Sequence, residues 1–260
     1  MLRYLRIWWF MSIASMQIFF VSRIGAVLFL TGKILRFILY MGFLIILVSK
    51  TKILAGYDLW QVMLFYLTFN LIDSLTQMLF REVYRFRQQI VGGNFDLLLV
   101  KPFNILFRVL FGWTDILDFL TLIPFIFMIS FIISKLSHVT ILGIFFYIIL
   151  IINAFMIALS FHVIVLALAI LTTEIDHTIM IYRDITGMGK FPVDIYKEPL
   201  RSAITFIIPV GIMMTFPVKS LLGVLSLGTI ILSITIGILI FSGSILIWRY
   251  ALRQYSSASS

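Results

Sequence analysis

The chain has 260 residues, of which 62% are hydrophobic and 12% charged, with no cysteine and a formal net charge of +9. The core of one soluble domain cannot bury this much apolar surface, so lipid must cover part of it. Without cysteine, the chain has no disulfides, thiolate metal sites or cysteine nucleophiles. The bases lie at the ends of apolar runs, where anionic head groups explain them better than nucleic acid does.

The N-terminal segment, residues 1–22, reads MLRYLRIWWFMSIASMQIFFVS. Arginines and tryptophans are followed by apolar residues mixed with polar ones, without a clean small-residue cleavage site, so a cleavable signal peptide is not indicated. The pattern predicts an amphipathic helix that lies in the membrane interface without crossing it.

Six apolar runs predict membrane-spanning helices, because the bilayer core requires about 20 residues at a rise of about 1.5 Å each. The fourth of these runs has about 33 residues and, as one helix, would be longer than the bilayer core is thick. It should therefore tilt, protrude or break, and a break would fall at Asn153 or between Ser160 and His162. The fifth run is short, and an odd number of spans is the alternative if it stays outside the membrane. The expected spans cover residues 24–48, 59–80, 109–133, 139–171, 175–190 and 221–248.

Residues 192–217 contain four of the six prolines in the chain. Proline interrupts a helix, and irregular backbone at membrane depth requires protein or water to satisfy its freed polar groups. We therefore expect an external re-entrant segment of helix fragments before the last span.

The distribution of bases predicts the orientation of the chain. Ten bases lie on the side of both termini and of the loop at 81–108, and seven lie on the other side. The positive-inside rule then places both termini in the cytoplasm.

The loop at 81–108 is the longest strongly polar stretch between spans. Its first part, REVYRFRQQI, has a helix-forming composition. Gly92 and Gly93 would stop that helix, Asn94 or Asp96 could cap the next turn, and Pro102 would limit it. The result would be a compact helix-turn-helix unit, and the alternative is a solvated linker whose arginines contact head groups.

Two segments resemble the signatures of ABC-2 type permeases of bacterial ABC transporters. QIVGGNFDLLLVKPFNILFRV, residues 89–109, is similar to the loop pattern between their second and third spans, and FPVDIYKEPLRSAITFIIPVGIMMTFP, residues 191–217, is similar to their second signature. With the six runs, the resemblance covers nearly the whole chain as one domain, residues 1–260. Lys33 and Arg36 depart from the apolar first span of that group.

The resemblance implies an all-α integral membrane protein that forms half of a membrane domain. Its partners would be cytoplasmic ABC ATPase subunits, a second identical or homologous permease, and the lipids of a bacterial cell membrane. ATP and Mg²⁺ would bind the partner ATPase, and this chain would bind no cofactor. Residues 81–108 would couple the two parts through Arg81, Glu82, Arg85, Gly92, Gly93, Asp96 and Pro102, with the N-terminal helix as a second contact.

Several polar residues fall within the expected spans. Lys33 and Arg36 share one face of the first span, and Asp115 and Asp118 share one face of the third. These charges either pair between the two spans or snorkel, or they line a cavity that receives an acidic or amphipathic substrate. A polar stripe on the second span either forms interhelical hydrogen bonds or lines the substrate route. Its members are Asn70, Asp73, Ser74 and Gln77.

No motif of enzyme chemistry occurs. The chain has no phosphate-binding G-x-x-x-x-G-K-[ST] loop and neither G-x-S-x-G nor H-E-x-x-H, and its histidines lack partners at metal-ligand spacing. The expected function is therefore that of a permease subunit of an ATP-driven exporter. A secondary transporter or channel without ATP, or a scaffolding membrane protein, is the alternative.

Overall fold

The computed structural model describes residues 2–21, 23–172 and 176–256, and the regular elements of these residues are helical. The termini of the sequence and the connection between the fourth and fifth expected spans lie outside the described residues. The main helices are α1 (Leu2–Val21), α2 (Arg23–Thr51), α3 (Leu59–Phe80), α4 (Phe86–Val91), α5 (Asn94–Leu99), α6 (Ile105–Phe111), α7 (Ile116–Lys135), α8 (Ile141–Thr172), α9 (Asp176–Gly187), α10 (Leu200–Ser202), α11 (Phe216–Leu221) and α12 (Leu227–Gln254). Short 3₁₀ or π segments are η1 (Arg81–Arg85), η2 (Met188–Lys190), η3 (Val193–Ile195), η4 (Ala203–Ile207) and η5 (Gly211–Thr215).

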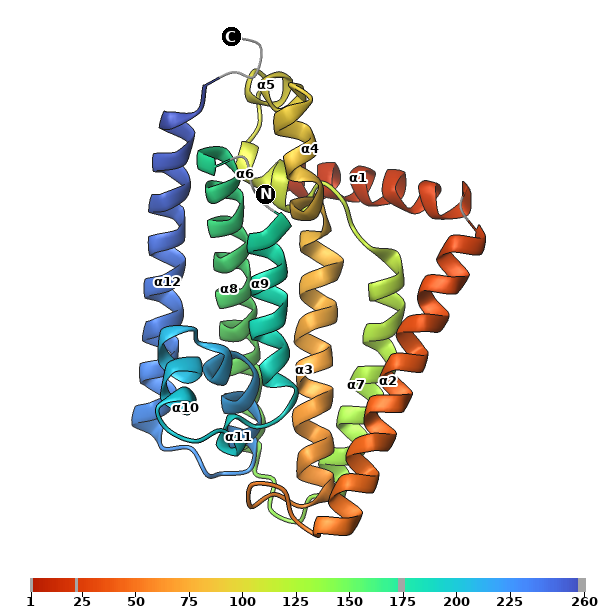
Figure 1. Cartoon of the computed structure of the whole chain (residues 1–260), viewed down its shortest axis with the longest axis vertical. Helices are drawn as coiled ribbons and strands as arrows, with labels where there is room; N and C mark the ends of the chain where they lie inside the picture. Colours follow the sequence, from red (N-terminus) through yellow and green to blue (C-terminus); the bar gives the residue numbers. More distant parts are fainter. Residues whose placement is uncertain (1, 22, 173–175, 257–260) are drawn as a thin grey trace.

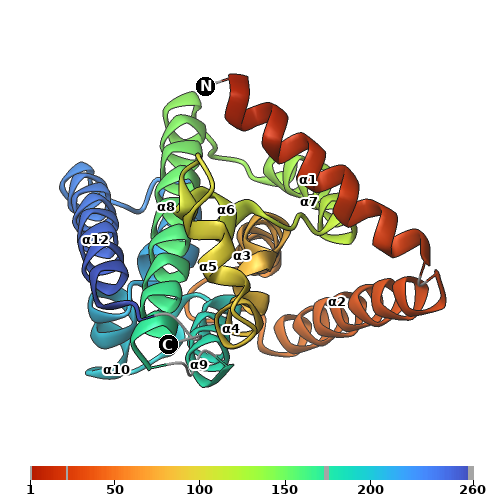
Figure 2. The same ribbon diagram turned by 90° about the horizontal axis from the view of Figure 1, so that it is seen from above.

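The long helices run side by side, and the two ends of the bundle differ (Figure 1). At one end α1 lies across the bundle, and the α4–α5 hairpin projects beyond it close to the end of α12. At the other end lie α10 and α11, between α9 and α12. Seen from above, α2 stands at the edge of the bundle, whereas α3 and α8 are more central (Figure 2).

Length and composition identify five described helices that could cross a membrane, or six if one bent pair counts as a span. The five are Arg23–Thr51, Leu59–Val91, Ile116–Lys135, Ile141–Thr172 and Leu227–Gln254. The bent pair, Leu200–Ile207 with Gly211–Leu221, turns by 79° next to Pro209. The chain is thus a multi-pass helical membrane protein.

The fifth expected span, residues 175–190, is the weakest of the sequence-based predictions. Ile175 lies outside the described residues, and α9 has 12 residues, or about 18 Å of helix, which is too short to cross the bilayer. The sixth candidate span is instead the bent pair, within the segment predicted to be re-entrant.

The other spans also differ from the prediction in detail. The third span begins at Ile116 and not near Val109, because α6 ends at Phe111 and a non-helical stretch follows it. Of the three alternatives for the fourth span, the structure excludes a break, since α8 continues for 32 residues, which leaves a helix that tilts or protrudes. Asn153 donates to the Ser233 carbonyl of α12 at 3.0 Å, and Ser160 donates to the Met156 carbonyl of its own helix at 2.7 Å. These two donors are bonded without any opening of the helix, and the Asn153 amide oxygen is buried without a hydrogen-bond partner among the described residues.

The burial of the long helices is very uneven. In its most apolar stretch, 67% of the residues of α3 are buried within the chain, against 17% for α2. α3 packs on α2, α7 and α8, whereas α8 also packs along α12. The α2 helix is therefore an edge element that leaves most of its surface to lipid or to another chain.

A tyrosine, an aspartate and a lysine connect the α2–α3 loop to the bent segment. Tyr57 donates to Asp194 at 3.1 Å, and Lys219 pairs with the same carboxylate at 2.7 Å. Burial, together with the neighbouring Asp194, raises the pKa of Tyr57, so this hydroxyl stays protonated and continues to donate. The Val193 amide is bonded to the Thr215 hydroxyl at 3.1 Å, so a side chain satisfies irregular backbone here.

The contact between α8 and α12 depends on a small residue at Gly237. A Cβ at Gly237 would lie 2.0 Å from Asn153 Oδ1 and 3.1 Å from the Met156 methyl. We predict that Gly237→Leu separates α8 from α12 and lowers the melting temperature of the detergent-purified protein by roughly 5 °C. Gly243→Leu on the same helix is the control, because no neighbour lies within 4 Å of its Cβ position. Equal melting temperatures for the two variants would contradict this account of the helix contact.

Candidate functional site

The segment predicted to couple the chain to a partner forms a helical hairpin, which we call the coupling hairpin (residues 81–101). Helices α4 and α5 are joined at Gly92 and Gly93, and Gly93 has φ +68°, which glycine adopts without strain. A Cβ at Gly92 would lie 2.9 Å from the Gln88 carbonyl. Across the turn, the rings of Phe86 and Phe95 pack edge to face at 5.0 Å, and both are fully buried. Glycine and aromatic packing together make the hairpin compact.

The charged residues at the base of the hairpin contact neighbouring side chains, and Glu82 is the buried one among Arg81, Glu82 and Arg85. Glu82 is 3% exposed and pairs with Arg108 at 3.0 Å, and it also accepts from Gln89. Arg85 lies over the ring of Trp113, 4.2 Å from its centroid. The prediction that Arg81, Glu82 and Arg85 act in coupling stays a prediction, but Glu82 has no surface for direct contact with a partner.

Three apolar side chains of the hairpin are largely exposed. Val91 is 65% exposed, Leu97 62% and Val100 82%. Sequence reasoning concentrated on the basic residues and missed these three, although apolar residues in an otherwise polar loop were a usable signal. An exposed apolar patch with a polar rim is typical of a protein-binding surface.

The coupling hairpin and the segment that follows it contact both ends of the described chain. At the N-terminal end, Arg3 donates to the Pro102 carbonyl at 3.3 Å, and Ser12 is bonded to Thr114 at 2.8 Å. At the C-terminal end, Tyr255 donates to Asp96 at 2.9 Å, and its ring packs on Phe95 at 5.0 Å. Asp96 thus receives the C-terminal end of α12, and the N-cap residue of α5 is Gly93. A cleft of about 540 Å³ remains between α1 and the hairpin.

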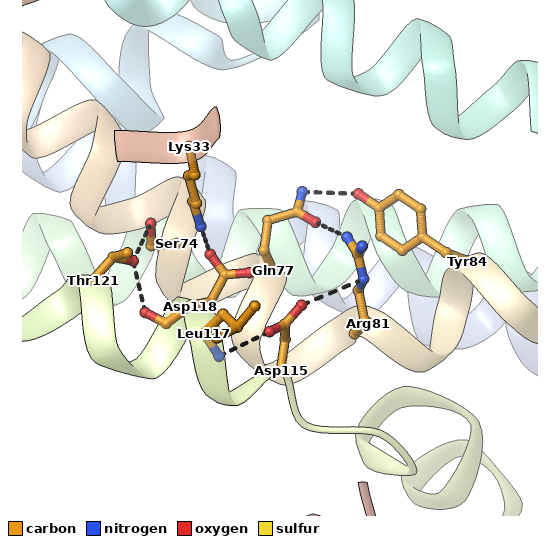
Figure 3. A network of polar contacts seen from close by, with 9 residues as sticks. All are labelled: Lys33, Ser74, Gln77, Arg81, Tyr84, Asp115, Leu117, Asp118 and Thr121. Carbon is orange, nitrogen blue, oxygen red and sulfur yellow. Dashed lines mark hydrogen bonds and ion pairs between the residues drawn. The ribbon is translucent and has the colours of Figure 1, made fainter. Parts of the chain in front are cut away.

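A network of charged and polar side chains joins α2, α3 and α7 (Figure 3). Lys33 of α2 forms an ion pair with Asp118 of α7, one of the two alternatives that the sequence left open. Arg81 lies 3.7 Å from Asp115 and donates to Gln77 at 3.2 Å, and Gln77 donates to Tyr84 at 2.9 Å. Charges from distant parts of the sequence therefore compensate each other at the hairpin end of the bundle.

The two aspartates lie at the start of α7, whereas the expected third span placed them about two turns inside it. Asp115 is the N-cap of α7 and accepts from the Leu117 amide at 3.0 Å, and Asp118 lies in the first turn. Negative charge is stabilised there by the helix dipole and the free amides. The expected depth was wrong because the third span begins seven residues later than predicted, at 116 and not at 109.

The polar stripe on α3 is only partly interhelical. Asn70 donates to the Tyr66 carbonyl of its own helix at 2.7 Å. The contact to another helix comes from Ser74, which is bonded to Thr121 of α7 at 3.4 Å. Asp73 faces a cavity, which it shares with Lys33 and Arg36. Interhelical bonding therefore explains less of the stripe than the sequence suggested.

This cavity, which we call the charged chamber, lies between α2, α3, α7 and α9 and has a volume of about 330 Å³. The sequence did not point to one of the residues that line it, Arg183 of α9, because this residue falls within the predicted fifth span and was not considered as a site residue. No local pattern could have placed it beside Asp73, since 110 residues separate them and only the packing of α9 brings them together. The charged residues that line the chamber are Lys33, Arg36, Asp73, Arg81, Asp118 and Arg183.

The fold and the hairpin define a multi-span membrane protein with a compact protruding element, as expected of a transport permease. The family described as "ABC-2 family transporter protein" matches residues 33–259, and the chain belongs to this family. The comparisons with curated proteins and with solved structures returned no match. Family membership makes the chain a transport subunit of the membrane, and it implies an ABC ATPase as a partner.

Loss of one partner of the Lys33–Asp118 ion pair should destabilise the protein more than loss of both partners. Their side chains are 16% and 2% exposed, so removing one leaves a buried charge, at a cost of about 3 kcal/mol. We predict that Lys33→Met and Asp118→Leu each lower the melting temperature and the yield of purified protein, and that the double variant recovers most of the loss. Lys50→Met, on an exposed residue at the other end of α2, is the control. Additive losses in the double variant would show that the two charges do not act as a pair.

Proposed function

We propose that the chain is the permease subunit of an ATP-driven exporter and that the coupling hairpin docks on the ATPase. The observation that carries this proposal is the family match over residues 33–259. The exposed patch at Val91, Leu97 and Val100 supports the docking role, because it offers a partner apolar surface at the tip of a compact element. ATP and Mg²⁺ bind the ATPase, and this chain contributes no catalytic residue.

The hairpin is suited to transmit force. Its first part continues α3 through η1, because Leu59–Val91 forms one continuous helical segment that is long and apolar enough to be a candidate span. Its apolar interior is continuous with a cluster that includes Phe80 of α3, Leu166 of α8 and Trp248 of α12. Because packed interiors respond as units, a displacement of the hairpin moves these helices together. ATP-driven closure of the partner would thereby reach the spans.

In this proposal the substrate leaves the cytoplasm through a cleft between two permease subunits, identical or homologous. Both termini and the hairpin lie on the cytoplasmic side of a bacterial cell membrane, with the bent segment outside. The position of α1 across the hairpin end of the bundle supports its role as an interfacial helix and as a second contact for the ATPase (Figure 1). The bases around the hairpin support this orientation.

A secondary transporter or a channel is the alternative function. Such transporters often use broken helices in corresponding positions of two repeats. Within the described residues there is one bent pair, near the C-terminus. This arrangement and the family match favour an ATP-driven permease.

Replacing the apolar tip of the hairpin tests the proposal. We predict that Leu97→Asp combined with Val100→Asp abolishes copurification of the ATPase and lowers ATP-dependent transport tenfold or more, because buried charge opposes docking. The fold should persist, since both side chains are exposed. Val224→Asp is the matched control, because Val224 is 62% exposed and lies just before α12, whose start is at the other end of the bundle. Full ATPase association in the double variant would refute the docking surface.

A further inference from the structure

The charged chamber continues into a second, mostly apolar cavity. The second cavity, which we call the apolar chamber, also has a volume of about 330 Å³, and it shares Lys33, Arg36 and Asp73 with the charged chamber. Its other walls come from α2, α3 and α7. They are Ile34, Phe37, Ile38, Tyr66, Asn70, Thr121, Pro124, Phe125 and Met128. A charged and an apolar compartment therefore meet at the same three residues.

Positive charge is in excess in the charged chamber. Four bases line it against two carboxylates. Lys33 is paired with Asp118, and Arg81 lies beside Asp115. In the described part of the chain neither Arg36 nor Arg183 forms an ion pair, which leaves two guanidinium groups with Asp73 as the one further carboxylate in the lining.

Excess positive charge at this position attracts an anion. Arg36 is the fourteenth residue of α2, about 20 Å along the helix from its start, and α2 is long and apolar enough to be a span. Guanidinium groups bind carboxylate and phosphate oxygens through two parallel hydrogen bonds. The chamber is thus complementary to an anionic group and not to a neutral or cationic one.

The apolar chamber is complementary to a hydrocarbon chain. It contains two phenylalanines, a proline and a methionine, and methionine adapts to irregular apolar ligands. One wall of the chamber is α2, which is the least buried of the candidate spans. A ligand dissolved in the membrane can therefore enter beside α2 with its polar end toward the bases.

We propose that the two chambers together bind an anionic amphiphile, with its acidic head between Arg36 and Arg183 and its apolar tail beside Phe37 and Phe125. This amphiphile is the transported substrate, and that part of the proposal rests on the function proposed above. The pairing of Lys33 with Asp118 keeps one base neutralised, so that selectivity depends on the two arginines.

Binding is measured on the purified permease chain in nonionic detergent, by melting temperature and by titration. The probe is dioctanoyl phosphatidic acid, which combines an acidic head with short tails. Dioctanoylglycerol supplies the tails alone, and inorganic phosphate supplies the head alone. We expect the phosphatidic acid to bind at least tenfold more tightly than either part.

Arg36→Gln combined with Arg183→Gln should weaken binding of the phosphatidic acid at least tenfold. Arg249→Gln combined with Arg253→Gln is the matched control, because these two arginines lie on exposed positions of α12 outside the chambers. Unchanged binding in the first double variant, or an equal loss in the second, would overturn the proposal. The proposal would also be overturned if the first double variant lost its permease dimer but kept its binding, because the arginines would then contact the second permease and not the ligand.

Transport in vesicles with the ATPase distinguishes a substrate from a resident lipid. We expect a fluorescent phosphatidic acid to change leaflets when ATP is added, and not in the Arg36→Gln and Arg183→Gln variant. Binding without ATP-dependent movement would mean that the site holds a structural lipid, which refutes its role in transport. If no ATPase associates with the chain, the proposed function fails, whereas tight binding of the acidic probe would still support the anionic site.

Discussion

Compensation of charge at the hairpin end of the bundle is the constraint on which the rest of the arrangement depends. An uncompensated ionised side chain within a span costs about 2.5 to 3.5 kcal/mol, so a base near α2 or α3 is stabilised by an acid from elsewhere in the chain. Asp118 and Asp115 provide two of these acids from the start of α7, where free amides already favour negative charge. The ion pairs thereby fix where α7 begins relative to α2 and α3, and they leave the remaining guanidinium groups around a cavity.

The two ends of the molecule use different means to satisfy polar groups. At the hairpin end, long charged side chains reach across from neighbouring helices, and a turn at Gly93 allows the chain to reverse within two residues. At the other end, irregular backbone between Pro192 and Leu221 is held by short contacts such as Thr215 to Val193 and Lys219 to Asp194. The hairpin end thus has exposed side chains that a partner could contact, whereas the polar groups of the bent segment are bonded within the chain.

The long apolar helices and the hairpin could be predicted from the sequence, because span length and glycine turns are local properties. The boundaries could not. Val109 looks like the start of a span, yet the Asn104 cap begins a separate short helix that ends before Asp115, and the packing of this stretch against α1 is visible only in three dimensions. Likewise, the apolar residues of α9 suggested a span, but a helix of 12 residues is too short to cross the bilayer. In the candidate site, Lys33 and Asp118 were predicted as members of a possible pair between spans, whereas Arg183 and Leu97 were missed, since neighbours distant in sequence determine the surroundings of each.

The bond between Tyr255 and Asp96 has a mechanical consequence. It ties the last described turn of α12 to the tip region of the hairpin, while η1 joins the base of the same hairpin to α3. With two attachments on opposite sides, the hairpin cannot swing freely about its glycines, and a push on it is shared between the first half of the chain and the last helix. The α2 helix takes no part in this connection and is held to its neighbours by contacts such as Lys33 to Asp118, so a push on the hairpin reaches α2 through α3 and α7.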